Sequence, residues 1–177
     1  MKQKKIFGDE RRKQILQWLT DSRHPLTGGE LAERANVSRQ VIVQDISLLK
    51  AKNEPIIATS QGYMYLQQNK EEKLFERVVA CKHTPEQTRD ELQLIVDHGV
   101  TVKDVIIEHP VYGDLKASIM VSNRSEVEQF TEQVETTDAP YLLELTGGVH
   151  LHTLQADSES KLDNAPRSLQ EANYIVT

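Results

Sequence analysis

The sequence of 177 residues is poor in cysteine, in aromatic residues and in long apolar runs. Its single cysteine, Cys81, cannot form a disulfide within the chain, which is typical of a protein from a reducing compartment. No run of about 18 apolar residues is present, so we expect no membrane-spanning segment. The charged start, MKQKKIFGDERRK, does not lead into the apolar stretch of a secretion signal. We therefore expect a cytoplasmic protein with no membrane partner.

Positive charge is scarce overall, since the net charge is −6, but it is unevenly distributed. Residues 1–66 hold eleven basic and seven acidic residues, a net charge of +4, whereas residues 67–177 hold ten basic and twenty acidic residues, a net charge of −10. A small basic module joined to a larger acidic one is typical of a DNA-binding head on a sensing or dimerising body. The polar junction at Lys70–Lys73 predicts a boundary between domains 1–69 and 70–177.

The spacing of apolar residues in the first domain predicts three amphipathic helices, over residues 10–20, 28–35 and 39–50. Thr27 and Glu30 have the spacing of a capping box for the second helix, and Ser38 is a good N-cap for the third. Two short strands are expected next, over residues 56–59 and 63–66. A short helix, a turn and a third helix form a helix-turn-helix, and the hairpin would be the wing of a winged variant.

The third predicted helix has an apolar inner stripe and an outer face that is uncharged but rich in hydrogen-bonding groups. The outer face comprises Gln40, Val43, Gln44 and Ser47. Amide and hydroxyl groups suit base edges, and valine suits the thymine methyl group. Arg39, at the helix start, is placed for a phosphate or a guanine, and Ser38 adjoins it. We therefore predict that all six residues contact DNA. The alternative is a three-helix bundle used for protein contacts, which the polar face and the basic charge make less favourable.

The second domain has the pattern β-α-β-β-α-β, which predicts a ferredoxin-like α+β sandwich with the helices on one face of an antiparallel sheet. The expected strands are 74–83, 100–109, 115–121 and 149–154, with helices beginning near residues 84 and 122. The polar stretch 157–170 is expected to be a loop, and residues 174–176 an additional edge strand.

Histidines in this domain suggest a metal site. His150 and His152 flank one residue of a strand, so their side chains project from the same face with Cβ atoms roughly 6 to 7 Å apart. His83 lies where the first strand ends, and Glu91 on the following helix could approach the same place. Three imidazoles and a carboxylate suit Zn, Ni, Fe or Co. The distance along the chain leaves open whether His83 meets His150. Cys81 could also be a ligand, although a structural role is favoured.

Four segments resemble the nicotinate-responsive transcription repressors of the NiaR type. The segment TGGELAERANVSRQVIVQDISLLKAKNEPIIATSQGYMYL is similar to their winged helix-turn-helix. The segments VACKHTPEQTRDELQLIVDHG, DVIIEHPVYGDL and LTGGVHLHTL are similar to their three-histidine (3H) domain. The resemblance covers about residues 12 to 155.

This resemblance implies that the second domain is a nicotinate sensor with one divalent metal ion per chain. The implied metal ligands are His83, Glu91, His150 and His152, and the implied ligand-binding residues are His109 and Tyr112. The implied function is repression of genes for NAD biosynthesis or niacin uptake, with nicotinate or a related pyridine carboxylate as co-repressor. Reading a pseudo-palindromic operator would require a homodimer.

Two other functions remain open at the level of sequence. In the first, the metal ion itself is the effector of a metal-responsive regulator. In the second, the metal activates water in an enzyme, which would need a general base beside the ion. Asp90, Asp97 and Glu108 are near in sequence, but each is more simply a solvated charge. No nucleophile elbow, phosphate loop or zinc-protease motif is present, so we expect that the protein is not an enzyme.

Overall fold

The computed structural model describes residues 7–66 and 74–176, and the chain divides into two compact units, Met1–Asn69 and Lys70–Thr177. The junction Lys70–Lys73, where the charge pattern predicts the domain boundary, lies outside the described residues. Within the described part of the chain, no helix has both the length and the apolar character needed to cross a bilayer.

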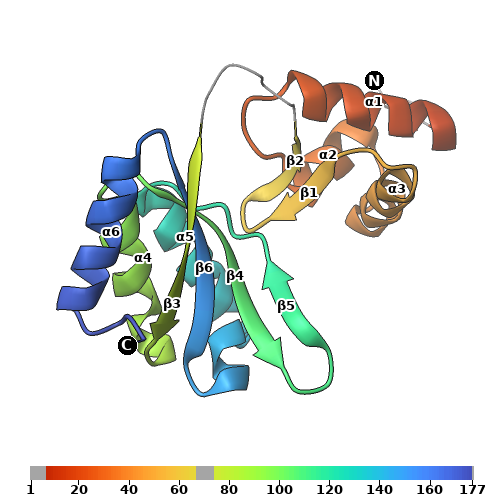
Figure 1. Ribbon diagram of the computed structural model, residues 1–177. Helices are drawn as coiled ribbons and strands as arrows, with labels where there is room; N and C mark the ends of the chain where they lie inside the picture. Colours follow the sequence, from red (N-terminus) through yellow and green to blue (C-terminus); the bar gives the residue numbers. More distant parts are fainter. Residues whose placement is uncertain (1–6, 67–73, 177) are drawn as a thin grey trace. The chain divides into compact units, whose positions relative to one another are not determined.

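The N-terminal unit is the predicted helix-turn-helix followed by a hairpin (Figure 1). Its elements are α1 (Gly8–Asp21), α2 (Gly28–Ala35), α3 (Arg39–Ala51), β1 (Ile56–Thr59) and β2 (Gly62–Tyr65). The capping box of α2 is present: the Glu30 amide donates to Thr27 Oγ1, and the Thr27 amide donates to the Glu30 carboxylate. Ile15, Leu31 and Ile42 are fully buried and join the three helices in one core.

The β1–β2 hairpin is attached to the segment that precedes α2. Leu26 and Tyr63 exchange two backbone hydrogen bonds, of 3.0 and 2.8 Å. This approach requires Gly62, because a Cβ at that position would lie 2.6 Å from the carbonyl oxygen of Leu26 and its φ is +133°. The wing is therefore held by main-chain contacts next to the helix-turn-helix.

The C-terminal unit is a four-stranded antiparallel sheet with helices on one face, which confirms the predicted α+β class and order of elements (Figure 1). Its elements are β3 (Phe75–Lys82), the 3-10 turn η1 (Pro85–Gln87), α4 (Thr88–Val96), β4 (Thr101–His109), β5 (Gly113–Ala117), α5 (Arg124–Thr137), the 3-10 segment η2 (Leu142–Thr146), β6 (Val149–Ala156) and α6 (Glu159–Glu171).

The strand order, β3-β6-β4-β5, departs from the expected ferredoxin-like sheet. In a ferredoxin-like sheet the third strand lies between the first and the second, whereas here the last strand, β6, has that place. His152 on β6 accordingly lies opposite Val79 of β3 and Val105 of β4. The histidines of β6 are thus inside the sheet and not at its edge.

The prediction of a loop over residues 157–170 is wrong, because α6 occupies this stretch. The apolar residues Leu162, Ala165 and Leu169 are buried at helical spacing. Pro166 in the helix interior has no N–H group, so it would leave the carbonyl of Leu162 without a partner. The Arg77 guanidinium donates to that carbonyl at 2.7 Å, which satisfies it.

The expected edge strand over residues 174–176 is reduced to one pair. Ile175 forms a single isolated β-bridge with Cys81 of β3.

Candidate metal centre and DNA-reading helix

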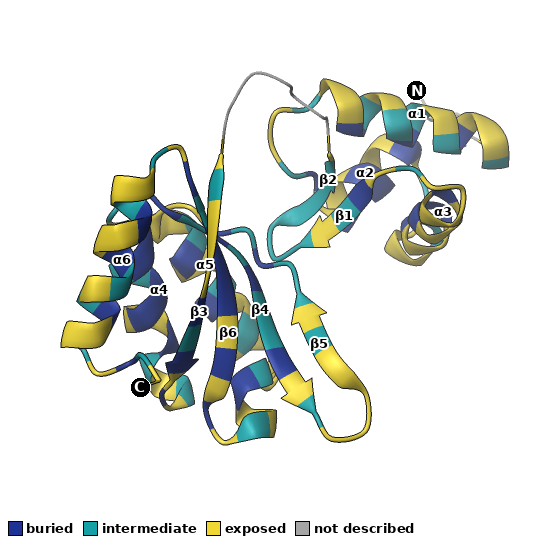
Figure 2. Cartoon of the chain, in the orientation of Figure 1, coloured by how far each residue is buried: buried dark blue, intermediate teal, exposed yellow. Residues whose placement is uncertain are grey.

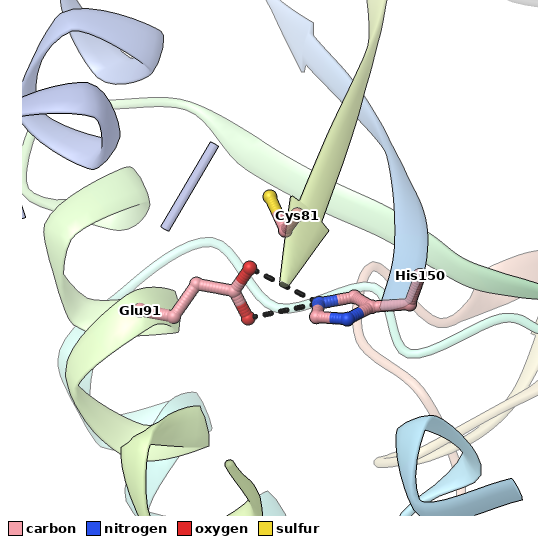
Figure 3. A group of neighbouring side chains, drawn as sticks. All are labelled: Cys81, Glu91 and His150. Carbon is pink, nitrogen blue, oxygen red and sulfur yellow. Dashed lines mark hydrogen bonds and ion pairs between the residues drawn. The ribbon is translucent and has the colours of Figure 1, made fainter. Parts of the chain in front are cut away.

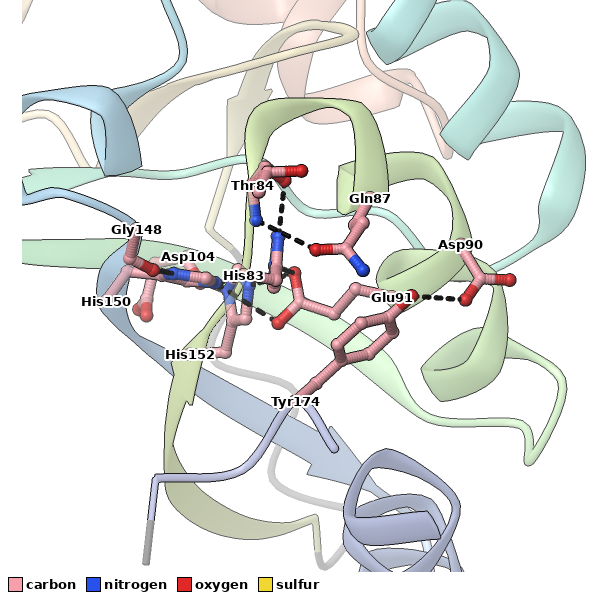
Figure 4. Close-up of polar contacts among 10 residues, drawn as sticks. All are labelled: His83, Thr84, Gln87, Asp90, Glu91, Asp104, Gly148, His150, His152 and Tyr174. Atoms are coloured by element: carbon pink, nitrogen blue, oxygen red, sulfur yellow. Dashed lines mark hydrogen bonds and ion pairs between the residues drawn. The ribbon is translucent and has the colours of Figure 1, made fainter. Parts of the chain in front are cut away.

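The four predicted metal ligands meet in the C-terminal unit (Figure 4). The Glu91 carboxylate on α4 lies 2.7 Å from His83 Nε2, 3.1 Å from His150 Nε2 and 3.2 Å from His152 Nε2. His83 directly follows β3, and the other two histidines project from β6. All four side chains are at most 4% exposed. The fold therefore brings together residues that are up to 69 positions apart, from 83 to 152.

Each imidazole is oriented by a main-chain carbonyl. The carbonyls are those of Thr84 (2.8 Å from His83 Nδ1), Gly148 (2.9 Å from His150 Nδ1) and Asp104 (2.7 Å from His152 Nδ1). A carbonyl oxygen only accepts hydrogen bonds, so each Nδ1 carries the hydrogen and each neutral ring has its lone pair on Nε2. All three lone pairs then face the same carboxylate.

This arrangement needs a cation. Three Nε2 lone pairs and a carboxylate are all acceptors, so the buried cluster is stable only if protons or a metal ion lie among them. His83 Nε2 is buried and makes no hydrogen bond of good geometry, although Glu91 is 2.7 Å away. Three nitrogen donors and one oxygen donor, with Nδ1 bonded to a carbonyl, form a set that could hold Zn, Ni, Fe or Co.

Protonation equilibria in the cluster agree with this requirement. Burial by itself raises the pKa of Glu91, but the neighbouring imidazoles outweigh burial and hold that pKa well below its usual value. Burial lowers the pKa of His83 and of His152, but the Glu91 carboxylate outweighs it and raises both. Without an ion, the cluster therefore balances its carboxylate by keeping protons on imidazoles.

Cys81 lines the same cluster from β3 (Figure 3). Its sulfur atom, a Glu91 oxygen and a ring nitrogen of His150 lie within 4.8 Å of one another, so this group too could hold an ion. Burial raises the pKa of the Cys81 thiol, and the Glu91 carboxylate raises it further. The side chain is fully buried, and without an ion its thiol keeps its proton. The structural role of Cys81 stays a prediction.

Two residues that the sequence did not single out complete the centre. The Tyr174 ring lies 5.2 Å from the His83 ring, and its hydroxyl donates to Asp90 at 2.7 Å. Burial and the Asp90 carboxylate raise the pKa of Tyr174 to about 12. At Gly148, whose φ is +97°, a Cβ would lie 2.3 Å from the carbonyl oxygen of His83. Glycine is therefore required where β6 begins beside His83.

A cavity of about 130 Å³ adjoins the cluster. Its walls are mostly apolar and come from α4, β4, α5 and the segment before β6; they include Leu92, Val105, Ile119, Phe130, Val134 and Leu143. Glu91, His150 and His152 reach it from the cluster. Thr88 also lines it, and its buried hydroxyl has no hydrogen-bond partner among residues 7–66 and 74–176. The sequence signal for Thr88 was its position one helical turn before Glu91, on the same helix face.

The other two predicted ligand-binding residues are elsewhere. His109 ends β4 and Tyr112 follows it in the turn before β5, where Tyr112 is 74% exposed. Their rings are 5.0 Å apart, and His109 Nδ1 accepts the backbone amides of Val111 and Tyr112. Neither residue lines the cavity beside the cluster. The structure therefore does not bring them together with the four candidate metal ligands.

All six predicted DNA-contacting residues are exposed at the start of α3 or along it. Ser38 is the N-cap by position, although its side chain makes no capping hydrogen bond. Val43 is 41% exposed, an unusual exposure for an apolar side chain between glutamines. Ile42, Ile46 and Leu49 are buried, as the inward stripe predicts.

A buried ion-pair network holds the inner side of α3. Asp45 is 2% exposed, and its carboxylate lies 2.5 Å from Arg11 Nε and 3.0 Å from Arg12 Nη1, both on α1. This network could not be predicted from the sequence, because nothing in the local pattern links residues 33 or 34 positions apart. It fixes α3 against α1 and leaves the opposite face of α3 exposed.

Comparison with known domain families first defines the class of protein by its two domains. An HTH domain family matches residues 11–64, and the 3H domain family matches residues 76–177. The chain is therefore an α+β protein with an N-terminal HTH domain and a C-terminal 3H domain.

They then define the family. The chain is 60% identical over 173 residues to the transcription repressor NadR of Bacillus subtilis, covering 97% of this chain and 96% of the relative. It is 41% identical over 172 residues to the probable transcription repressor NiaR of Thermotoga maritima, covering 97% of each. The chain belongs to this family of NadR- and NiaR-type transcription repressors. These relatives are transcription repressors, which are not enzymes.

Proposed function

We propose that this protein represses transcription in the cytoplasm by binding operator DNA as a homodimer through α3. The exposed, uncharged face of α3 supports direct reading of bases, and the net charge of +4 of residues 1–66 supports attraction to phosphates. Two copies of α3 related by a two-fold axis would read half-sites one helical turn or a multiple of it apart. The similarity to two transcription repressors, one of them named as probable, supports repression as the outcome.

The C-terminal unit, in this proposal, senses nicotinate or a related pyridine carboxylate as co-repressor. The observation that carries the proposal is the cavity of about 130 Å³ beside four candidate ligands of one divalent transition metal ion. This volume is close to that of a cavity of about 150 Å³ that binds one benzene ring, so the carboxylate of nicotinate would have to extend toward the metal site. The apolar walls suit a pyridine ring, and the unpaired hydroxyl of Thr88 suits a carboxylate. A metal ion with an open position would accept the carboxylate or the ring nitrogen.

Regulation follows if nicotinate prefers one state of the protein. A ligand shifts a two-state equilibrium only by its differential affinity for the two states, so nicotinate must bind the DNA-competent dimer more tightly. The genes controlled would be those of NAD biosynthesis or niacin uptake, where repression by nicotinate closes a feedback loop.

The test is a titration of the metal-loaded full chain on the DNA upstream of its own gene, followed by fluorescence anisotropy at fixed salt. Nicotinate is expected to tighten binding to this DNA. Nicotinamide, and nicotinate in the presence of a chelator, are expected to leave the affinity unchanged. The double variant His150→Ala/His152→Ala should lose the response. Thr88→Val should weaken it while metal content is unchanged, and Thr136→Val on the outer face of α5 is the matched control. Binding that is unchanged by nicotinate in metal-loaded protein would overturn the proposal.

A metal-responsive regulator is the second candidate. Three imidazoles and a carboxylate can complete a closed four-coordinate site without any organic ligand, which favours this alternative. Its signature in the same titration is DNA affinity that follows metal concentration and ignores nicotinate.

A further inference from the structure

Among the described residues of the C-terminal unit, 74–176, no helix packs on one of the two faces of the sheet. Helices α4, α5 and α6 pack on the opposite face. Because successive residues of a strand point to opposite faces, every second residue of β3 and β6 packs with the helices and the residues between them lie on the open face. The open face carries apolar residues on three neighbouring strands: Val78, Ala80, Ile106, Val149 and Leu151. Figure 2 shows exposed segments along the strands of this sheet. Ala80, Leu151 and Ile106 are direct partners in the strand register, so they form one continuous row. Val78 is 58% exposed, Val149 41% and Leu151 36%.

This composition is unusual for a sheet face exposed to water. An antiparallel sheet with one open face normally carries polar residues there. A contiguous apolar patch rimmed by polar residues marks an interaction surface. The buried Asp104 on this face is paired with Lys116 on β5, which leaves the central rows without net charge.

The charges at one end of the open face identify the occupant. One row beyond Ala80, Leu151 and Ile106, the edge strand β3 carries Lys82 and the opposite edge strand β5 carries Asp114. Glu108, the register partner of Asp114, adds a second negative charge there. All three are exposed, and within residues 7–66 and 74–176 none of them forms an ion pair.

We infer that a second copy of this chain docks on the open face, with the two-fold axis running along the strands between the two sheets. This rotation puts β3 of one copy over β5 of the other in the same row. Lys82 of each copy then faces the Asp114–Glu108 pair of the other, so the contact forms twice. The apolar rows of β6 and β4 face each other at the centre, in the manner of two sheets packed about 10 Å apart.

Self-complementarity favours a second copy over an unrelated protein. In a two-fold interface the same surface of both copies must be complementary to itself. Lys82 at one side of this face and the Asp114–Glu108 pair at the other meet this condition. At the other end of β3, Glu76 is already paired with Lys103, so it offers no free charge for a different orientation. The inference deepens the proposed function, because it names the surface that would form the proposed DNA-binding dimer.

The experiment is sedimentation velocity of the metal-loaded full chain over a range of concentrations, without DNA and without nicotinate. The wild-type chain is expected to be dimeric. Val78→Glu should raise the dimer dissociation constant by about a hundredfold, because one charge from each copy enters the apolar surface that docking covers. Val111→Glu is the matched control, since Val111 is 77% exposed in the turn after β4 and should leave the dimer unchanged.

A charge exchange tests the orientation. Lys82→Glu and Asp114→Lys should each raise the dissociation constant by about tenfold or more, since each places like charges opposite one another twice. The double variant Lys82→Glu/Asp114→Lys should restore wild-type association. Glu132→Lys on α5 is the control for charge reversal, and bound metal with circular dichroism verifies the fold of every variant.

The outcomes separate this inference from the proposed function. A monomeric wild-type chain, a dimer that Val78→Glu does not weaken, or a double charge variant that stays weakened would overturn the inference. Binding of nicotinate and operator DNA could still be found in that case. A dimer that Val78→Glu dissociates supports the inference even if nicotinate has no effect on DNA binding.

Discussion

Each unit of the protein buries a carboxylate that helps to hold its helices, Asp45 in the N-terminal unit and Glu91 in the C-terminal unit, and the two carboxylates are neutralised differently. In the N-terminal unit, Asp45 is 2% exposed and is held by the guanidinium groups of Arg11 and Arg12. In the C-terminal unit, Glu91 is fully buried and faces three imidazoles whose hydrogens point away, toward backbone carbonyls. The first carboxylate meets fixed positive charge, and the second meets three groups that can be neutral.

This difference determines whether the stability of each unit depends on protons or cations from solution. A guanidinium is always charged, so the Asp45 network needs nothing from solution. An imidazole is charged only when protonated, so the Glu91 cluster depends on protons or on a bound cation. We therefore expect the stability of the helix-turn-helix unit to be independent of added metal ions, and the stability of the C-terminal unit to depend on protons or a bound cation.

The largest effect is expected from removing the charge of Asp45. Asp45→Asn leaves buried Arg11 without its counter-charge, and breaking a buried pair on one side costs about 3–5 kcal/mol. Urea unfolding followed by the fluorescence of Trp18, the only tryptophan in the chain, measures this cost in the N-terminal unit. Asp9→Asn is the control, because that side chain is 84% exposed; its effect should be within about 0.5 kcal/mol. Equal losses of stability in Asp45→Asn and Asp9→Asn would show that the buried ion pair contributes no more to stability than the exposed one.

Metal is expected to stabilise one unit only. With free Zn²⁺ about a hundredfold above its dissociation constant, a single site adds about 2.7 kcal/mol to the folded state. Calorimetry with Zn²⁺ and then with a chelator should show a shift in the transition of the C-terminal unit, while the transition reported by Trp18 stays in place. A shift of both transitions, or of neither, would contradict the comparison.

The outer face of α3 is expected to contribute specificity and not stability. Gln44→Ala should relax the preference for one base pair of the operator by about 1–3 kcal/mol, because an amide that reads a base edge is lost. Anisotropy titrations on operator variants measure this change, and urea unfolding checks that stability is unchanged. Equal losses on operator and on random DNA would show that Gln44 does not read a base.

The smallest effect is expected when the same carboxylate-to-amide change is made at Glu91. In the presence of a chelator, Glu91→Gln should cost about 1 kcal/mol, because the imidazoles can release their protons when the negative charge is lost. The variant should also lose most of the stabilisation by Zn²⁺. A cost as large as that of Asp45→Asn, measured by urea unfolding, would show that the imidazoles of the cluster keep their positive charge when the carboxylate is removed, as the arginines do.

Local patterns in the sequence were sufficient for most of the elements. The capping box at Thr27, the N-cap position of Ser38 and the alternation around Leu151 each involve residues within one turn or one pair of strand positions. For this reason the helices of the first unit and the shared face of His150 and His152 could be predicted. The order of the strands could not, because it depends on pairings between segments far apart.

Several of the missed features depend on distant partners. The polar composition of residues 157–170 indicated a loop, whereas the hydrogen bond from Arg77, 85 positions before Leu162, satisfies the carbonyl that Pro166 leaves open and lets α6 continue. Residues alone did not establish that His83 meets His150; that expectation came from the family resemblance. Thr88 had a local signal, its spacing from Glu91, but Tyr174 had none.

The main-chain carbonyls that orient the three imidazoles have a consequence for the evolution of the protein. A carbonyl oxygen is the same in every residue type, so substitutions at Thr84 or Asp104 can change the side chain and still leave the orienting group in place. Gly148 is the exception, since any side chain there meets the carbonyl of His83. The orientation of the three imidazoles thus depends on the path of the backbone and on Gly148, and not on the side chains of Thr84 and Asp104.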